Sequence, residues 1–172
     1  MKLKVLRKIE DKINLEITGA TLLSIEEAEA LPNHVRAYTN WWWLRSPGYH
    51  SYLAAYVSDS GGVFTFGSNV NHSAGAVRPA LKIKNFKSSG LKIGDSIFFD
   101  NKEFEIISDG LAFCKTNIGV YCFRSDYNAK DANNYKKSDI KIFVDVWFKD
   151  AKKAEEKPAP HKEYSYPGCM CC

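Results

Sequence analysis

Cysteine and histidine are the residues of this chain best able to ligate a metal or attack a substrate. The chain has five cysteines and four histidines among 172 residues. Cys114 and Cys122 flank the turn-forming residues 116–119, so a hairpin could bring the two thiols face to face. Because thiols stay reduced in the cytosol, small buried cysteines are favoured at both positions over a disulfide, which is the alternative.

The remaining cysteines and the histidines form no recognisable site. The last four residues contain three cysteines that lack the paired spacing and histidine partners of a zinc site: Cys169, Cys171 and Cys172. No serine, cysteine or carboxylate stands at a catalytic spacing from any of the histidines, which are His34, His50, His72 and His161. We therefore predict no metal, no cofactor and no catalysis, and leave the role of the terminal cysteines open.

Residues 49–76 stand out by what they lack. These 28 residues contain one charged side chain, Asp59, although a chain with 26% charged residues would place about seven there. Lys, Glu, Met and Trp are also absent from them, and Gln is absent from the whole chain. Tyr, Phe, His, Ser, Asn and Gly prevail, which supply rigid aromatic contact area and adaptable hydrogen bonding. This composition indicates a binding surface; an uncharged loop layer over the core is the alternative.

Aromatic and arginine side chains on either side of this segment are predicted to hold it in place. Three consecutive tryptophans, residues 41–43, would bury rings on both faces of a strand, with the indole N–H groups reaching partners. Arg45 and Arg78 would each fix a loop through hydrogen bonds to carbonyls or a carboxylate. Pro47-Gly48 predicts a turn, and Pro79 suits the edge of a strand.

The elements around these residues predict an α+β domain with a small, irregular and mostly antiparallel sheet. Gly61-Gly62 predicts a hairpin turn, and Asp100-Asn101 and Asp109-Gly110 predict two more turns in an antiparallel meander. Alternating apolar residues between these turns predict short strands within residues 2–17 and at residues 55–57, 63–66, 77–81, 96–99, 104–108, 111–115 and 120–124.

Two helices are predicted to pack on this sheet. Ser24 and Glu27 have the spacing of a capping box before a helix over residues 25–31, which Pro32 ends. Ser138 is the predicted N-cap of a second helix with one apolar stripe, formed by Ile140, Phe143, Val144, Trp147 and Phe148. Residues 1–150 are thus predicted to form one domain, and residues 151–172 a flexible charged tail ending in cysteines.

The chain carries no sign of a membrane or nucleic-acid protein. No run of 18 apolar residues exists, and the first residues lack the continuous apolar segment of a signal peptide. The net charge of +4 is mild and its lysines are scattered. We expect a cytoplasmic protein, or a virion-associated one if a phage encodes it, without nucleic-acid partners and with homo-oligomers possible.

The frame WWLRSPG…AAYV…GAVRPAL, from Trp42 to Leu81, resembles the hallmark of a bacterial and phage C-type-lectin-like family whose members include variable proteins of diversity-generating retroelements. The frame covers about a quarter of the chain. The resemblance implies a C-type-lectin-like fold. It also implies fixed frame residues, namely Trp42, Trp43, Leu44, Arg45, Ser46, Pro47, Gly48, Ala54, Ala55, Val57, Gly62, Val63, Gly67, Val70, Gly75, Val77, Arg78, Pro79 and Leu81.

The resemblance further implies how the segment acquired its composition. In such retroelements an error-prone reverse transcriptase rewrites template adenines, so that Asn codons scatter to residues that never include Lys, Glu, Gln, Met or Trp. These five residue types are the ones missing from residues 49–76. The positions off the frame are the expected diversified ligand contacts: Tyr49, His50, Ser51, Tyr52, Leu53, Tyr56, Ser58, Asp59, Phe64, Thr65, Phe66, Ser68, Asn69, Asn71, His72 and Ser73.

Two features depart from the family pattern. Segments that usually precede the frame have their similar pieces after it here, at residues 93–123 and 135–141, so the chain looks circularly permuted. Permutation is tolerated where chain termini lie close together. The second departure is the cysteine-ended tail, which has no counterpart in the family.

Three functions follow from these observations. The favoured hypothesis is a protein that binds a protein or cell-surface ligand through a hypervariable surface, for phage adhesion or bacterial surface recognition; its ligand stays unidentified. Acidic residues other than Asp59 are absent from the segment, so no calcium site is predicted. The alternative is a non-diversified structural or assembly subunit of a virion or surface complex. An enzyme like the fold-related formylglycine-generating enzymes would need a reactive cysteine pair, for which Cys114 and Cys122 are the only candidates.

Overall fold

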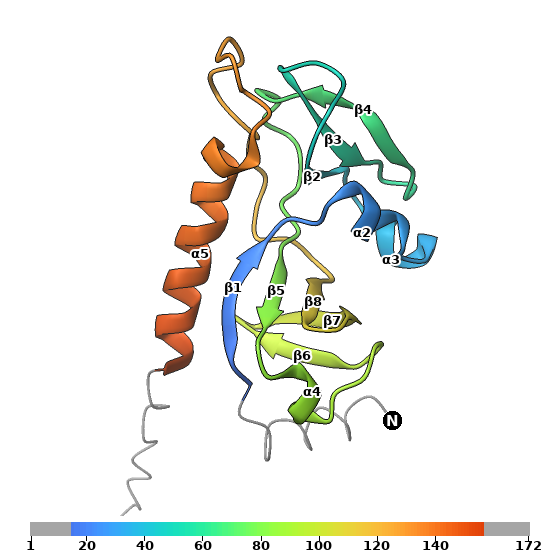
Figure 1. Cartoon of the computed structure of the whole chain (residues 1–172), viewed down its shortest axis with the longest axis vertical. Coiled ribbons are helices and arrows are strands. Elements are labelled where there is room, and N and C mark those ends of the chain that lie inside the picture. The colour runs from blue at the N-terminus through green and yellow to red at the C-terminus, as the bar shows by residue number, and fades with distance from the viewer. Residues whose placement is uncertain (1–14, 157–172) are drawn as a thin grey trace, which may run out of the picture.

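Two antiparallel sheets and one long helix dominate residues 15–156, the part of the chain that the computed structural model describes (Figure 1). The five-stranded sheet has the order β1-β5-β8-β7-β6, and its strands are β1 (Ile17–Thr21), β5 (Ala80–Ile83), β6 (Ser96–Phe99), β7 (Lys102–Ser108) and β8 (Leu111–Cys114). The three-stranded sheet has the order β2-β3-β4, formed by β2 (Trp42–Pro47), β3 (Leu53–Val57) and β4 (Val63–Asn69). The helices are α2 (Ile25–Glu29), α3 (Asn33–Arg36), α4 (Phe86–Ser89), the 3₁₀ turn η1 (Tyr135–Lys137) and α5 (Asp139–Glu156).

This arrangement confirms the predicted α+β class with antiparallel pairing. The hairpin at Gly61-Gly62 is confirmed, because β3 and β4 pair antiparallel on either side of it. The turn at Asp100-Asn101 also forms as predicted, and both residues have positive φ angles of 52° and 56° between β6 and β7. Positive φ at two successive residues is what a tight two-residue hairpin turn requires, and Asp and Asn tolerate it.

The strand predicted at residues 120–124 is wrong. In the described chain only Val120 of this segment makes a bridge, and its partner is Ala76 rather than a residue of β8. The reason lies in the sheet order, because β5 and β7 already occupy both edges of β8. Residues 118–121 bond instead to Gly75 and Val77 through the backbone. The expected hairpin that would have brought Cys114 and Cys122 face to face therefore does not form.

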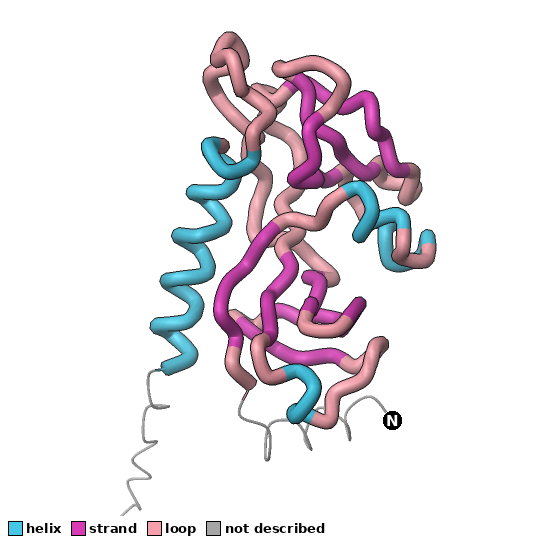
Figure 2. The backbone as a smooth tube through the Cα atoms, in the orientation of Figure 1, coloured by secondary structure: helices cyan, strands magenta, loops and turns pink. Residues whose placement is uncertain are grey.

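Two long irregular loops follow strands β4 and β8. Residues 70–79 lead from β4 to β5, and residues 115–134 lead from β8 to the 3₁₀ turn before α5, as Figure 2 shows. Because the first loop stays irregular through Pro79, β5 begins at Ala80 instead of the predicted Val77. These loops bond to each other, with Val77 N–H donating to the Gly119 carbonyl at 2.9 Å.

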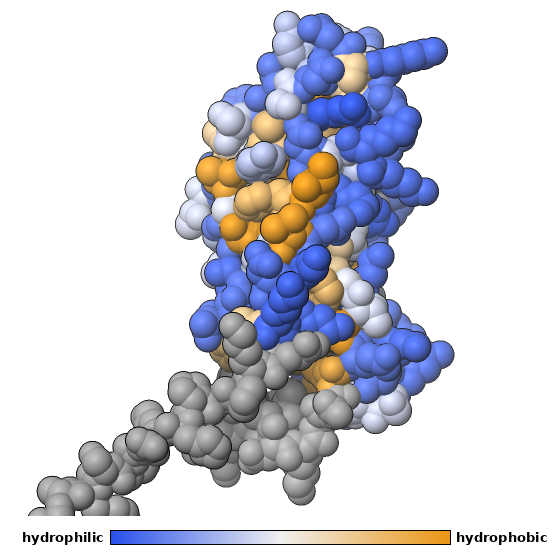
Figure 3. Space-filling view, turned by 90° about the vertical axis from the view of Figure 1, so that its left-hand side faces the viewer, coloured by the Kyte–Doolittle hydropathy of each residue, from blue (hydrophilic) through white to orange (hydrophobic). Residues whose placement is uncertain are grey.

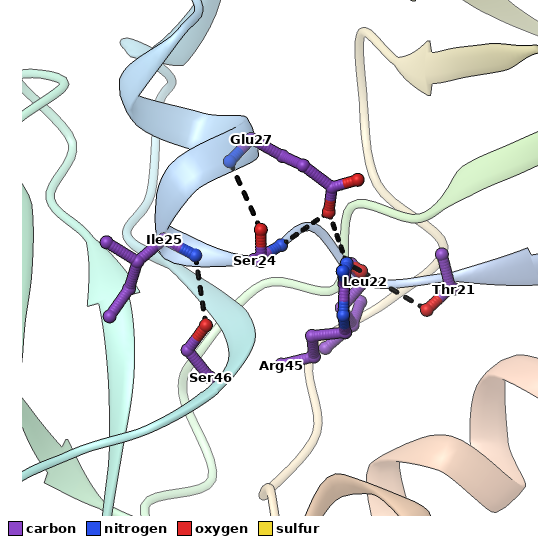
Figure 4. Close-up of polar contacts among 7 residues, drawn as sticks. All are labelled: Thr21, Leu22, Ser24, Ile25, Glu27, Arg45 and Ser46. Carbon is purple, nitrogen blue, oxygen red and sulfur yellow. Dashed lines mark hydrogen bonds and ion pairs between the residues drawn. The ribbon is translucent and has the colours of Figure 1, made fainter.

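The predicted capping box at the start of α2 is confirmed and it also fastens the frame strand β2 (Figure 4). Glu27 N–H donates to the Ser24 hydroxyl at 3.1 Å, and Ser24 N–H donates to the Glu27 carboxylate at 2.8 Å. From β2, Arg45 donates to the same carboxylate and to the Leu22 carbonyl, and Ser46 accepts from Ile25 N–H. Helix α2 ends at Glu29, two residues before the predicted end at residue 31. A separate short helix, α3, follows Pro32.

Helix α5 covers the five-stranded sheet along β1, and its predicted apolar stripe points inward (Figure 1). The Ser138 hydroxyl accepts from Lys141 N–H at 3.1 Å, so Ser138 caps the helix as predicted. The predicted boundary after residue 150 falls inside this helix, which continues to Glu156 and buries Ala151 against the sheet. The predicted strands before residue 15, and also His161, Cys169, Cys171 and Cys172, lie outside the described residues.

Candidate functional site

The three-stranded sheet is held by tryptophans on both of its faces. Trp42 and Trp43 follow one another in β2 and are both fully buried, one in the core that contains Phe113 and the other in the core that contains Phe123. Trp42 Nε1–H donates to the Arg36 carbonyl at 3.0 Å, and Trp43 Nε1–H donates to the Tyr121 carbonyl at 2.9 Å. Each ring is therefore fixed by packing and by one directed bond.

Arg78 joins the two sheets from a buried position. Its guanidinium donates only to main-chain carbonyls, which belong to residues 35, 36, 114, 115 and 116 at 3.2–3.5 Å. It lies 4.9 Å from the Trp42 ring of β2 and 4.4 Å from the Phe113 ring of β8. Burial lowers the pKa of Arg78 to about 10, which still leaves the group charged at neutral pH.

Gly75 is required where the loop after β4 crosses the tryptophans. A Cβ atom at this position would clash with Trp43 Nε1 and would lie 2.7 Å from the ring of Trp41. Only a residue without a side chain allows the loop to approach both rings this closely. The frame residue thus sets the distance between the loop and the sheet.

The off-frame residues lie on the outside of this scaffold. Leu53 is the exception, because its side chain is only 5% exposed and supports the sheet from within, so it is not available for the predicted ligand contact. The other predicted contacts are exposed or half-buried: Tyr49, His50, Ser51, Tyr52, Asp59, Phe64, Phe66, Asn69, Asn71, His72 and Ser73 are exposed, and Tyr56, Ser58, Thr65 and Ser68 are half-buried.

The exposed aromatic rings fall into two groups. The turn group consists of Tyr49, His50, Tyr52 and Phe66, in which the Tyr49 and Phe66 ring centroids are 5.2 Å apart and His50 stacks on Tyr52 at 5.5 Å. Asn133, from the loop before η1, steadies this group by donating to the His50 carbonyl at 3.0 Å. Tyr49 and Phe66 are 69% and 53% exposed, which is far more than folding alone requires of such residues.

The second group, the hollow group, consists of Trp41, Tyr56, Phe64 and His72. Tyr56 stacks on Phe64 at 5.0 Å, and Trp41 meets Tyr56 and His72 edge to face at 5.4 and 5.0 Å. Three of these rings border an open hollow of about 400 Å³, which is lined by Thr39, Asn40, Trp41, Tyr56, Ser58, Asp59, Ser68 and His72. Five of the eight lining residues are predicted ligand contacts.

Sequence reasoning missed the other three, Thr39, Asn40 and Trp41. Trp41 was assigned with its neighbours to the core, yet it is half-buried and lines the hollow. Its position immediately before β2, one residue outside the frame, was the only indication that it differs from Trp42 and Trp43. Thr39 and Asn40 carry no such mark, because only the folded chain brings them beside β3 and the loop after β4.

The similarity to known sequences lies in this half of the chain. Residues 14–85 match a domain of unknown function, DUF6273. No curated protein and no solved structure matches the chain. The matched segment contains β1 to β5, with the whole three-stranded sheet and both aromatic groups, and its first and last strands, β1 and β5, pair with each other.

The described residues contain neither a reactive cysteine pair nor a cluster of metal-ligating side chains. Cys114 and Cys122 are both free thiols, and burial raises the pKa of each, which disfavours the reactive thiolate. Between residues 15 and 156, no three His, Cys, Asp or Glu side chains cluster as metal ligands would. No helix in that range is both long and apolar enough to cross a membrane.

A separate apolar patch lies on the side of the molecule where α5 runs, and Figure 3 shows it. Ile142 and Val146, one turn apart on α5, are 63% and 53% exposed. Beside the helix, Tyr121 stacks on Phe143 with ring centroids 4.8 Å apart, and Val120 is 55% exposed. This patch belongs to a different face from the two aromatic groups.

Proposed function

We propose that this protein binds a protein or cell-surface ligand through the two aromatic groups and the residues between them. The observation that carries the proposal is the division of residues 42–81. Frame residues such as Trp42, Trp43 and Arg78 form the buried scaffold, and each of the sixteen predicted ligand contacts except Leu53 reaches the surface. A frame that keeps the fold and a surface that is free to vary are the two parts that a hypervariable binder needs.

The chemistry of the surface supports binding over mere solvation. Exposed positions on strands are normally filled by charged side chains, which solubilise the sheet edge. On β4 they are Phe64 and Phe66 instead, 47% and 53% exposed. Rigid aromatic anchors surrounded by Ser and Asn are the composition of adaptable binding sites, because they give contact area with little loss of side-chain entropy.

The finer assignment, a C-type-lectin-like variable protein of a diversity-generating retroelement, rests on the frame resemblance and on the missing residue types. Along the chain, β1 precedes the three strands of the smaller sheet and β5 follows them, and β1 and β5 pair with each other. This pairing is compatible with the assignment, because it holds both ends of the segment that contains the variable residues. The proposed role is recognition for phage adhesion or on a bacterial surface.

Deep sequencing of the gene across a growing population tests the proposal. Substitutions are expected only at off-frame positions between Tyr49 and Ser73, and only to residues reachable from Asn codons. The structure adds a restriction, because position 53 is buried and surviving variants there should stay apolar. Variation spread evenly over frame and off-frame positions would contradict the proposal.

Assembly is the second candidate function, and the apolar patch on α5 favours it. In an assembly subunit, Ile142 and Val146 would contact a second copy, whereas a monomer leaves them in water. Light scattering on the full chain separates the two. Replacing both residues with Ser dissociates an oligomer that uses this patch, and replacing Tyr49 and Phe66 with Ser dissociates one that uses the turn group.

A further inference from the structure

The hollow beside β3 has a chemical preference that its general role in binding does not specify. Its rings stand nearly at right angles, with interplanar angles of 72° between Trp41 and Tyr56 and 89° between Trp41 and His72. Rings in this arrangement direct their electron-rich faces in more than one direction around the same space. Such faces attract cations, and Trp is the most effective of the three residue types that do so.

The polar lining offers mainly acceptors. Asn40 donates one of its two amide N–H groups to the Ala74 carbonyl at 2.9 Å, which leaves its side-chain oxygen and its other N–H for a ligand. The Ser58 hydroxyl already accepts from Gly62 N–H at 3.0 Å and bonds to Ser60. The Asn40 oxygen is thus an acceptor that a basic ligand in the hollow can use.

Asp59 gives the hollow its charge. Its side chain is exposed at the rim, and within residues 15–156 no lysine, arginine or histidine forms an ion pair with it. The hollow has no lysine or arginine in its lining, so this carboxylate is unbalanced. An anionic ligand would be repelled by this carboxylate and a cationic one attracted to it.

We propose that the hollow binds a basic side chain, lysine or arginine, of a protein ligand. The ammonium or guanidinium group would pair with Asp59 and donate to the oxygen of Asn40, while its aliphatic stem lies against Trp41 and Tyr56. This inference rests on the proposed binding function and names the chemistry that one part of the surface selects. The turn group, which has no carboxylate, would serve the apolar contacts of the same ligand.

Nuclear magnetic resonance on the full chain tests this directly, because Trp41 reports on the hollow through its indole N–H. Trp42, Trp43 and Trp147 donate their indole N–H groups to Arg36, Tyr121 and Asp100 inside the protein, and serve as internal controls. The probes are N-acetyl-lysine methylamide and N-acetyl-arginine methylamide. The neutral comparison is N-acetyl-norleucine methylamide, which keeps the stem and removes the charge, and methyl mannoside represents a sugar.

Both basic probes are expected to shift the Trp41 resonance in a saturable manner, and norleucine and mannoside are not. Asp59→Asn should weaken binding of the basic probes by about two- to fivefold, since it removes an exposed charge while keeping the shape. Asp109→Asn is the matched control, because it removes an exposed carboxylate from the β7–β8 turn and should leave binding unchanged. Raising the salt concentration should weaken the binding as well.

Other outcomes overturn the inference. Equal shifts with norleucine would assign the hollow to apolar groups, a shift with mannoside alone would assign it to sugars, and no shift would show that it is unused. n-Butylammonium binding as tightly as the capped lysine would assign the hollow to free amines. If the basic probes bind but the gene shows no confined variation, the proposed function fails and the cation site stands; the opposite result removes only the cation site.

Discussion

The two sheets are built by the same rule and present different chemistry to the solvent. On the five-stranded sheet, Lys82 is an outward residue of β5, Glu103 of β7 pairs with Lys115 at 2.9 Å, and Phe98 of β6 is an exposed aromatic residue. On the three-stranded sheet, the outward residues of β4 are Phe64 and Phe66. Both sheets fill their inward positions with aromatic and aliphatic residues, so the difference is confined to the surface.

The comparison distinguishes residues that the fold requires from exposed residues that the fold does not require. An outward position on a strand can hold a charged residue without loss of stability, as β5 illustrates. Phe64 and Phe66 of β4 differ from the exposed Phe98 of β6 in that they pack on Tyr56 and Tyr49. We attribute these groups of rings to the proposed contact with another molecule. Five substitutions can break or sharpen this comparison, and the first concerns the residue that holds the two sheets together.

Arg78→Met should lower the free energy of unfolding by about 3 kcal/mol or more. The change removes the guanidinium donor from five buried or partly buried carbonyls, and methionine cannot replace any of these bonds. Only the Arg36 carbonyl among them keeps a bond from Trp42 Nε1–H. Urea unfolding measures the loss. Arg124→Met is the control, since Arg124 forms a partly exposed pair with Asp131 and should cost about 1 kcal/mol or less. Equal losses would mean that Arg78 does not join the sheets.

Gly75→Ala should destabilise the chain by about 1–3 kcal/mol, because the added methyl group forces Trp41 or Trp43 to move. The same substitution at Gly19 in β1 is the control. There a Cβ atom would meet only Lys82 Cδ at 4.0 Å, and its effect should be neutral or slightly stabilising. Thermal unfolding compares the two. A neutral Gly75→Ala variant would mean that the loop is not held against the tryptophans.

Ser24→Ala should destabilise by about 1 kcal/mol through loss of the α2 cap. The same cluster adds a pH dependence. Burial disfavours the charged carboxylate of Glu27, but hydrogen bonds from Ser24 and Arg45 outweigh this and hold its pKa below the ordinary value of 4.5. Its contribution is therefore complete above about pH 4.5 and is lost as the pH falls through the folded-state pKa.

Glu27→Gln should consequently be less stable than the wild type at pH 7, and the difference should shrink below pH 4.5. Unfolding curves between pH 3 and pH 7 measure this. Glu29→Gln removes the same charge from the other end of α2, outside the cluster, and serves as the control. If the difference in free energy of unfolding between wild type and Glu27→Gln stays constant down to pH 3, the ion pair between Glu27 and Arg45 does not cause that difference.

Phe66→Ala should have the smallest effect, within about 0.5 kcal/mol, because an exposed side chain contributes little to folding. Phe98 of β6 offers a close match, since it is 52% exposed and Phe66 is 53% exposed. Phe98→Ala should behave alike in thermal unfolding. If Phe66→Ala is clearly more destabilising than Phe98→Ala, the turn group is part of the core and the comparison between the sheets fails.

Local patterns in the sequence predicted the fold where the structure depends on neighbouring residues. The capping box at Ser24, the turn at Asp100-Asn101 and the stripe on α5 are all read within a few residues, and all three formed. Residues 120–124 have strand-like composition, yet Tyr121 and Arg124 donate through the backbone to Gly75 and Val70, more than 40 residues away. Helix α5 continues past its predicted end at residue 150, because Ala151 packs on the sheet although its neighbours in the sequence are charged.

The candidate site was predictable to a similar extent. Composition alone marked residues 49–76, because the absence of charge is visible without any structure. Composition could not separate Leu53 from its neighbours, since burial at that position follows from the sheet. Nor could it find Trp41, whose exposure depends on where the loop containing His72 comes to rest.

The bonds of Arg78 bear on how such a protein can change over generations. A main-chain carbonyl is the same whichever amino acid carries it, so the five acceptors survive any substitution that keeps the backbone in place. These bonds require arginine at position 78, but they do not depend on which amino acids supply the carbonyl groups. Substitutions at residues 35, 36 and 114–116 can therefore accumulate without removing the bonds that hold Arg78 in place.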